Sequence, residues 1–171
     1  MDEISTSTLL VSLVILIALS AYFSGSETGM MSINRYRLRH LVQHQHKAAT
    51  RVQYLLDRPD RLIGLILIGN NLVNIAASSI ATILFMRWLG DLGLLLAPFV
   101  LTLVVLIFAE VTPKTIAALH PERVAFPSSL ILRPLLTLLY PVVTSVNFIT
   151  NSFMRLLGID PKRAHVGDAL S

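Results

Sequence analysis

Oxygen-bearing side chains interrupt a stretch of sequence that is otherwise apolar. Residues 62–86 contain no charged side chain and no histidine. Asn70, Asn71 and Asn74 nevertheless lie in the first half of this stretch, and Asn70 and Asn74 are four residues apart, so they share one face of a helix. An amide in hydrocarbon is costly unless it is paired. Two amide oxygens that face inward without a charge of their own therefore suggest a weak site for a hard cation.

A second apolar stretch, residues 4–26, carries hydroxyl groups near its end. Ser20 and Ser24 lie one helical turn apart, and their hydroxyls can bond back to their own helix or face a neighbouring helix. Gly25 follows directly, and a glycine at this position permits the helix to loosen and to expose backbone carbonyl groups. We expect Glu27, just beyond, to lie near the membrane surface as a supporting residue.

A third apolar stretch, residues 94–109, is followed directly by Glu110. An ionisable side chain beside a membrane helix is a functional candidate by default. An alternative is that Lys114, four residues further on, neutralises Glu110 at the membrane interface. Pro113 has no N–H group and is predicted to break the helix near Ala109, which would free backbone carbonyls.

These polar groups are expected at similar depths in a bilayer. Counting about 1.5 Å per residue along each span places the serine, asparagine and glutamate candidates in the inner half of a hydrocarbon core about 30 Å thick. Oxygen ligands without cysteine or clustered membrane histidines argue against zinc or copper and suit Na⁺, Mg²⁺ or Ca²⁺. Ligand chemistry alone does not select among these three ions.

The composition agrees with a membrane protein. The chain of 171 residues is 54% hydrophobic and only 14% charged, a balance that few soluble domains show. It contains no cysteine, which excludes disulfides and thiolate metal sites. We find no aspartate pair, no zinc-protease motif and no serine with a base inside the membrane, so we do not expect an enzyme. The fold class predicted is an all-α integral membrane protein.

The expected elements follow the chain in order. Apolar spans are predicted over about 5–27, 62–86 and 93–112. Residues 33–57 combine basic residues with apolar ones at spacings of three and four, which predicts an amphipathic juxtamembrane helix on the cytoplasmic side, with the N-terminus outside. Residues 122–157 are apolar, but regularly spaced prolines and basic flanks favour interfacial or re-entrant helices over a fourth crossing. Both arrangements stay open.

Three motifs in this order resemble the transmembrane domain of the CorC/cyclin-M (CNNM) family of magnesium transporters. They are Phe23-Ser24-Gly25-Ser26-Glu27-Thr28, Gly69-Asn70-Asn71-Leu72-Val73-Asn74 and Glu110-Val111-Thr112-Pro113-Lys114-Thr115. The resemblance assigns residues 1–160 to one such domain. It leaves 158–171 as an expected linker toward a cytosolic regulatory domain that this chain does not include.

The resemblance implies a homodimer in the lipid bilayer of the cell (plasma or inner) membrane, with three spans per subunit and a cytoplasmic C-terminus. It implies Mg²⁺ export, thought to be driven by Na⁺ entry. The implied metal ligands are the side chains of Ser24, Asn70, Asn74 and Glu110, with a backbone carbonyl near Gly25. The supporting residues are Ser20, Ser26, Glu27, Asn71, Pro113 and Lys114. No ATP site and no nucleic-acid partner are expected within these residues.

Two other functions remain open. A membrane-anchored scaffold or regulator of ion homeostasis would bind anionic lipid or a partner through residues 32–61, without itself transporting an ion. That function leaves the asparagines and the glutamate inside the membrane unexplained. An ion channel would require a continuous polar stripe along the helices, whereas the outer halves of the spans are nearly bare of polar groups.

Overall fold

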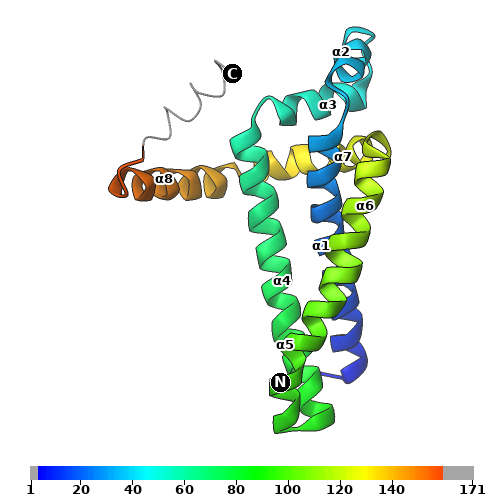
Figure 1. Ribbon diagram of the computed structural model, residues 1–171, viewed down its shortest axis with the longest axis vertical. Coiled ribbons are helices and arrows are strands. Elements are labelled where there is room, and N and C mark those ends of the chain that lie inside the picture. Colours follow the sequence, from blue (N-terminus) through cyan, green and yellow to red (C-terminus); the bar gives the residue numbers. More distant parts are fainter. Residues whose placement is uncertain (1–3, 160–171) are drawn as a thin grey trace.

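Three long helices run side by side in the computed structural model, which describes residues 4–159 (Figure 1). They are α1 (Thr6–Ser32), α4 (Pro59–Leu89) and the continuous run of α5 (Asp91–Val105), η1 (Leu106–Val111) and α6 (Thr112–Leu119). Each is long and apolar enough to cross a membrane, with mean hydropathies of 2.1, 1.6 and 2.8 over the most apolar windows. The prediction of an all-α membrane protein with three spans is confirmed for the described residues. The expected linker 158–171 lies almost entirely outside them.

The first span does not loosen at its glycine. α1 continues as a regular helix to Ser32, beyond the expected end near residue 27. Gly25 is buried, and a Cβ atom placed on it would lie 3.6 Å from the Cβ of Pro113 in α6. The expected loosening was therefore wrong: Gly25 lies at the contact between α1 and α6, with room for a methyl group, and its backbone stays within the regular helix.

The third span is also unbroken at its proline. Pro113 lies in the first turn of α6, and the preceding residues Leu106–Val111 form a π-helix. Proline cannot donate to the carbonyl four residues earlier, and the wider π turn takes up this missing bond without ending the helix. The predicted break near Ala109 is thus corrected to a local widening, and the span continues to Leu119.

The amphipathic segment predicted as one juxtamembrane helix over residues 33–57 forms two helices. They are α2 (Arg35–Gln43) and α3 (Lys47–Leu56). Asn34 caps the first, and the ring nitrogen Nδ1 of His46 caps the second by accepting a hydrogen bond from a backbone N–H. Gln45, with φ at 61°, turns the chain between them.

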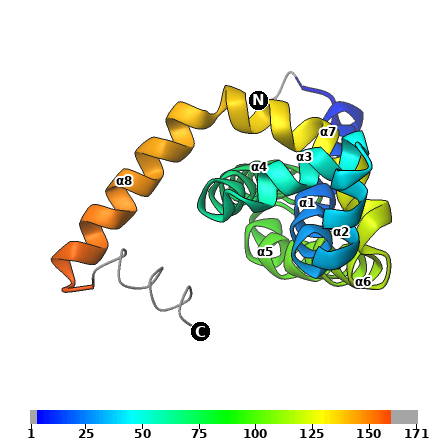
Figure 2. The same cartoon turned by 90° about the horizontal axis from the view of Figure 1, so that it is seen from above.

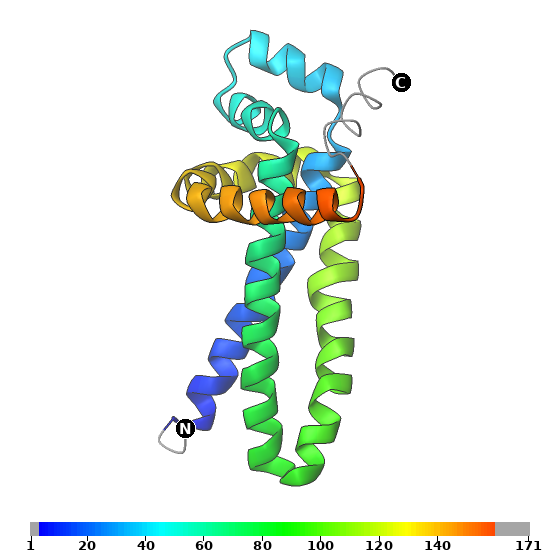
Figure 3. The same cartoon turned by 90° about the vertical axis from the view of Figure 1, so that its left-hand side faces the viewer.

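The last two helices lie across the bundle rather than along it (Figures 1 and 3). α7 (Pro121–Leu138) and α8 (Tyr140–Leu156) are bent by 72° relative to each other. Seen from above, α8 extends away from the three spans (Figure 2). By length and composition the bent pair could count as a fourth span. The interfacial or re-entrant arrangement predicted for residues 122–157 stays a prediction.

The best-packed region lies where the helix ends meet. Fully buried residues from six helices form one apolar cluster there, including Met30, Leu38, Leu55, Leu65, Leu132 and Val143. Side chains along the halves of the spans remote from this cluster, such as Val14 and Phe99, are exposed apolar groups. In a membrane protein these surfaces face lipid. The cluster thus anchors the spans at one end, close to the polar residues described next.

Candidate functional site

A serine hydroxyl joins the two asparagines on α4. Ser20 Oγ in α1 lies 2.8 Å from Oδ1 of Asn70 and 2.8 Å from Oδ1 of Asn74. Ser20 is fully buried, and both asparagines are half-buried. Asn74 Nδ2 also lies 3.4 Å from Asn70 Oδ1. The two amides therefore share one face and point at a neighbouring span, and Ser20 bonds across helices rather than to its own backbone.

A close approach of α1 and α4 makes this contact possible. A Cβ atom on Gly69 would lie 2.6 Å from Cζ of Phe23 and within 3.0 Å of two further ring atoms. Only a glycine fits at this crossing without displacing the buried ring. Gly69 thus sets the distance across which Ser20 reaches Asn70.

We expect Gly69→Ala to destabilise the protein by about 1–3 kcal/mol, because the added methyl overpacks the crossing against the Phe23 ring. Thermal unfolding of the purified protein measures this change. Gly25→Ala is the matched control, because its Cβ would meet Pro113 at an ordinary contact distance of 3.6 Å. Equal melting temperatures for the two variants would contradict the packing argument.

A second polar group joins α1 to the π-helix. Ser24 Oγ, fully buried, lies 3.4 Å from Oε1 of Glu110. The other carboxylate oxygen, Oε2, lies 3.1 Å from Nζ of Lys114. The Glu110 side chain is 27% exposed. Glu110 therefore both joins the serine of the first span and pairs with the lysine one turn further on.

The π-helix places this carboxylate. Single π turns inside α-helices are frequent at functional sites. Here the widened turn carries Glu110, while the buried Ala109 lies on the side packed against the bundle. The π turn lies within one continuous span, Asp91–Leu119.

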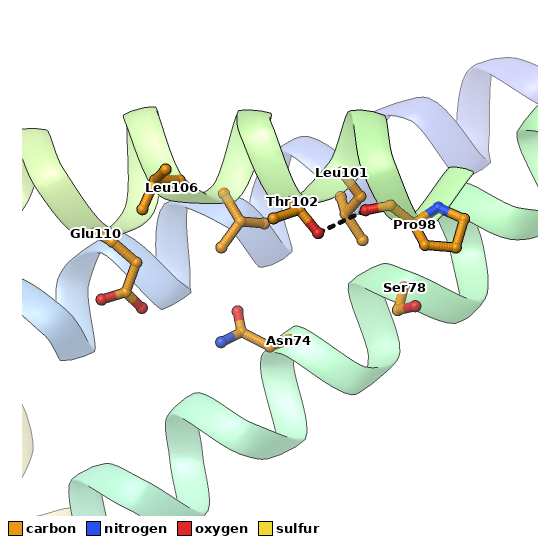
Figure 4. A pocket seen from close by; sticks show the side chains of 8 residues that line it. Asn74, Ser78, Pro98, Leu101, Thr102, Leu106 and Glu110 are labelled. Atoms are coloured by element: carbon orange, nitrogen blue, oxygen red, sulfur yellow. Dashed lines mark hydrogen bonds between the residues drawn. The ribbon is translucent and has the colours of Figure 1, made fainter. Parts of the chain in front are cut away.

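Asn74 and Glu110 line one cavity of ≈ 370 Å³ between α4 and the third span. Figure 4 shows their side chains pointing toward each other from facing helices. Ser78 and Thr102 add two hydroxyls on the same cavity, and the remaining lining residues are apolar: Pro98, Leu101, Val105 and Leu106. A polar end and apolar walls make this the candidate cation cavity.

Ser78 and Thr102 were absent from the ligands expected from the sequence. Ser78 lies four residues beyond Asn74, so the face shared by Asn70 and Asn74 could have been extended to it. Thr102 gave no such signal, because its position facing α4 depends on the packing of α5. Thr102 Oγ1 donates a hydrogen bond of 2.6 Å to the carbonyl oxygen of Pro98.

Seven further expected residues divide into two groups. Ser20, Ser24 and Asn70 lie behind the cavity wall and reach it through Asn74 and Glu110. Four residues lie elsewhere. Gly25 packs beside Pro113, and Ser26 forms hydrogen bonds with the Tyr22 carbonyl and with Ser128. Asn71 is exposed and lines a groove against α8. The half-buried Glu27 forms no ion pair within residues 4–159.

The donor set fits a hard cation. Every polar lining group offers oxygen, and no cluster of three or more histidine, cysteine or acidic side chains exists among the described residues. Asn74 Oδ1 accepts from Ser20, and the Glu110 carboxylate contacts Ser24 and Lys114. No buried side-chain polar atom in the described part of the chain lacks a partner. A cation that takes an oxygen of Asn74 or Glu110 therefore competes with these existing contacts.

Comparison with known proteins places these features in a family. Residues 11–169 match the cyclin M transmembrane N-terminal domain, CNNM. The chain is 61% identical over 141 residues, 82% of its length, to the UPF0053 inner membrane protein YfjD of Escherichia coli, and covers 33% of that protein. It is 52% identical over 159 residues to a UPF0053 protein of Haemophilus influenzae, with 93% of this chain and 38% of the relative covered.

A more distant relative carries a functional name. The polyamine export protein of Haemophilus influenzae is 28% identical over 167 residues, with 90% of this chain and 39% of the relative covered. The chain thus spans about a third of the length of the curated relatives it matches. With its three apolar spans, its polar cavity and a match over most of its length, this membrane-embedded chain belongs to the CNNM family, whose transmembrane domain it represents.

Proposed function

We propose that this chain transports Mg²⁺ across the membrane, with efflux coupled to Na⁺ entry. The observation that carries the proposal is the cavity shared by Asn74 and Glu110, in which amide, hydroxyl and carboxylate oxygens of different spans converge. Mg²⁺ prefers six oxygens at about 2.0–2.1 Å and usually keeps several waters. At roughly 30 Å³ for each water, a cavity of ≈ 370 Å³ leaves room for a partly hydrated ion.

The proposed transport cycle uses the residues already described. Mg²⁺ enters the cavity and binds oxygens of Asn74 and Glu110. The Ser20 and Ser24 hydroxyls, which donate hydrogen bonds to these residues, rotate and turn their oxygens toward the ion. Movement of the third span against α4 then exposes the ion on the other side. Na⁺, also a hard cation, takes overlapping oxygens on the return. Such an exchange requires that the ion can leave the site. A single carboxylate favours release, because it compensates only one of the two charges of a divalent ion.

The topology and assembly are part of the same proposal. The basic residues of α2 and α3 support a cytoplasmic position for these helices, with the N-terminus outside and the C-terminus inside. We propose a homodimer in the cell membrane, which rests on the family resemblance.

Polyamine export is a second candidate function. A primary ammonium, that of Lys114, already contacts the Glu110 carboxylate, and the cavity walls are largely apolar. Both features suit an aliphatic polycation, and one relative is named for polyamine export. This candidate predicts that spermidine competes with Mg²⁺ for the same carboxylate.

The decisive experiment reconstitutes the chain in liposomes that contain a Mg²⁺ indicator. We expect Mg²⁺ flux that an opposing Na⁺ gradient accelerates and a parallel Na⁺ gradient slows. A melting-temperature series with Mg²⁺, Ca²⁺, Mn²⁺, Na⁺ and spermidine tests selectivity, because a bound ligand raises stability with its concentration. Folded protein with no flux above empty liposomes and no Mg²⁺-dependent rise in melting temperature would refute Mg²⁺ transport. That result would favour the scaffold or, with a response to spermidine, the second candidate.

A further inference from the structure

The carboxylate of the candidate site is already held by a cation of the protein itself. Glu110 Oε2 lies 3.1 Å from the ammonium of Lys114, and Oε1 accepts from Ser24. Each carboxylate oxygen therefore has a partner from the protein in this conformation. Any cation that binds through Glu110 has to share this carboxylate with Lys114 or displace it.

Lys114 reaches Glu110 from outside the cavity. It lies one helical turn further along the third span, beyond the π turn and Pro113, and it is not among the cavity's lining residues. Its side chain is 48% exposed, against 27% for Glu110. A lysine carries a compact charge on a flexible four-carbon stem. The ammonium can therefore leave the carboxylate without moving the helix, while Glu110 stays in the cavity wall.

The charges of the site make this displacement necessary. Glu110 is the single acidic residue lining the cavity, and its pairing with Lys114 makes the empty site neutral. A divalent ion on the same carboxylate would lie a few ångströms from the ammonium, where like charges repel strongly in a medium of low dielectric. One carboxylate cannot compensate three positive charges. The ammonium and the metal ion are therefore alternative partners.

We propose that Lys114 is a tethered competitor of the transported cation: its ammonium holds Glu110 in the empty site and leaves it when a divalent cation binds. This inference rests on the proposed function, because it takes Glu110 as a ligand. Lys114 thereby positions the Glu110 carboxylate and sets the affinity of the site for the cation. A neutral empty site also lets the spans move without exposing an unpaired carboxylate to hydrocarbon.

Lys114→Met tests the proposal by removing the competitor and keeping the length of the side chain. We expect Mg²⁺ to bind about tenfold more tightly, an order of magnitude set by removing one nearby positive charge. We also expect a lower melting temperature without metal, because Glu110 loses its partner. Isothermal titration and Mg²⁺-dependent melting of the purified full chain measure both effects. A merely structural lysine would lower the melting temperature without raising affinity.

Two further variants complete the experiment. Lys47→Met makes the same substitution at an exposed residue that forms no ion pair within the described part of the chain, and should leave affinity unchanged. Lys114→Arg keeps the charge and should remain close to the unsubstituted protein. Unchanged or weaker binding by Lys114→Met, with binding intact in Lys47→Met, would overturn this inference and leave the proposed function standing. Absence of Mg²⁺ binding in every protein, including the unsubstituted chain, would refute both.

Discussion

Glu110→Gln should abolish most of the Mg²⁺-dependent stabilisation and flux. Glutamine keeps the shape of the side chain and an oxygen that can accept from the Ser24 hydroxyl, but it removes the single negative charge that lines the cavity. A divalent ion near a carboxylate gains about 4 kcal/mol or more at an effective dielectric constant near 20. We therefore expect a loss of Mg²⁺ affinity of roughly a hundredfold or more. Isothermal titration and liposome flux measure the two consequences.

Glu122→Gln is the matched control for this prediction. Glu122 pairs with Arg37 on α2, outside the candidate cavity, so the same substitution breaks an ion pair without touching the cavity. It should leave Mg²⁺ affinity unchanged. Stability without metal should fall little in Glu110→Gln, because the half-exposed Lys114 can turn its ammonium toward the headgroups. Equal Mg²⁺ responses in the two variants would remove Glu110 from the site.

The spans and the polar faces could be predicted from the sequence because both depend on local periodicity. An uncharged run of sufficient length specifies a crossing, and the spacing of Asn70 and Asn74 places them on one face. The pairing of Ser20 with these amides could not be predicted. It depends on how α1 is rotated against α4, which is set by the packing of Phe23 on Gly69.

The break expected near Ala109 and the loosening expected at Gly25 both failed, for a related reason. A proline removes one hydrogen bond, and the sequence permits either a break or a wider turn at Pro113. Inside a bilayer an open backbone leaves polar groups without partners, so the π-helix of Leu106–Val111 is the less costly outcome. Gly25 likewise stays helical, buried beside Pro113. The sequence shows at which residues a helix can break or widen, whereas the surrounding helices and lipid determine whether it does.

Asn74→Ala should weaken Mg²⁺ binding by about tenfold or more, an effect of roughly 1.4 kcal/mol. Asn74 is the asparagine that lines the cavity facing Glu110, so its amide oxygen is the neutral ligand best placed for the ion. The fold should persist, because Ser20 keeps its hydrogen bond to Asn70. Titration with Mg²⁺ and liposome flux give the affinity and the transport rate.

Asn71→Ala supplies the comparison that separates this site from a general effect of membrane asparagines. Asn71 belongs to the same motif and lies three residues away, yet it is exposed and lines the groove between α4 and α8. Its removal should leave Mg²⁺ affinity unchanged. Asn70→Ala should have an intermediate effect, since Asn70 supports Asn74 through Ser20 and does not line the cavity. Equal losses in all three variants would mean that the asparagines act through helix packing. A graded loss from Asn74 to Asn70 to Asn71 would identify α4's inward face as the part of the second span that holds the ion.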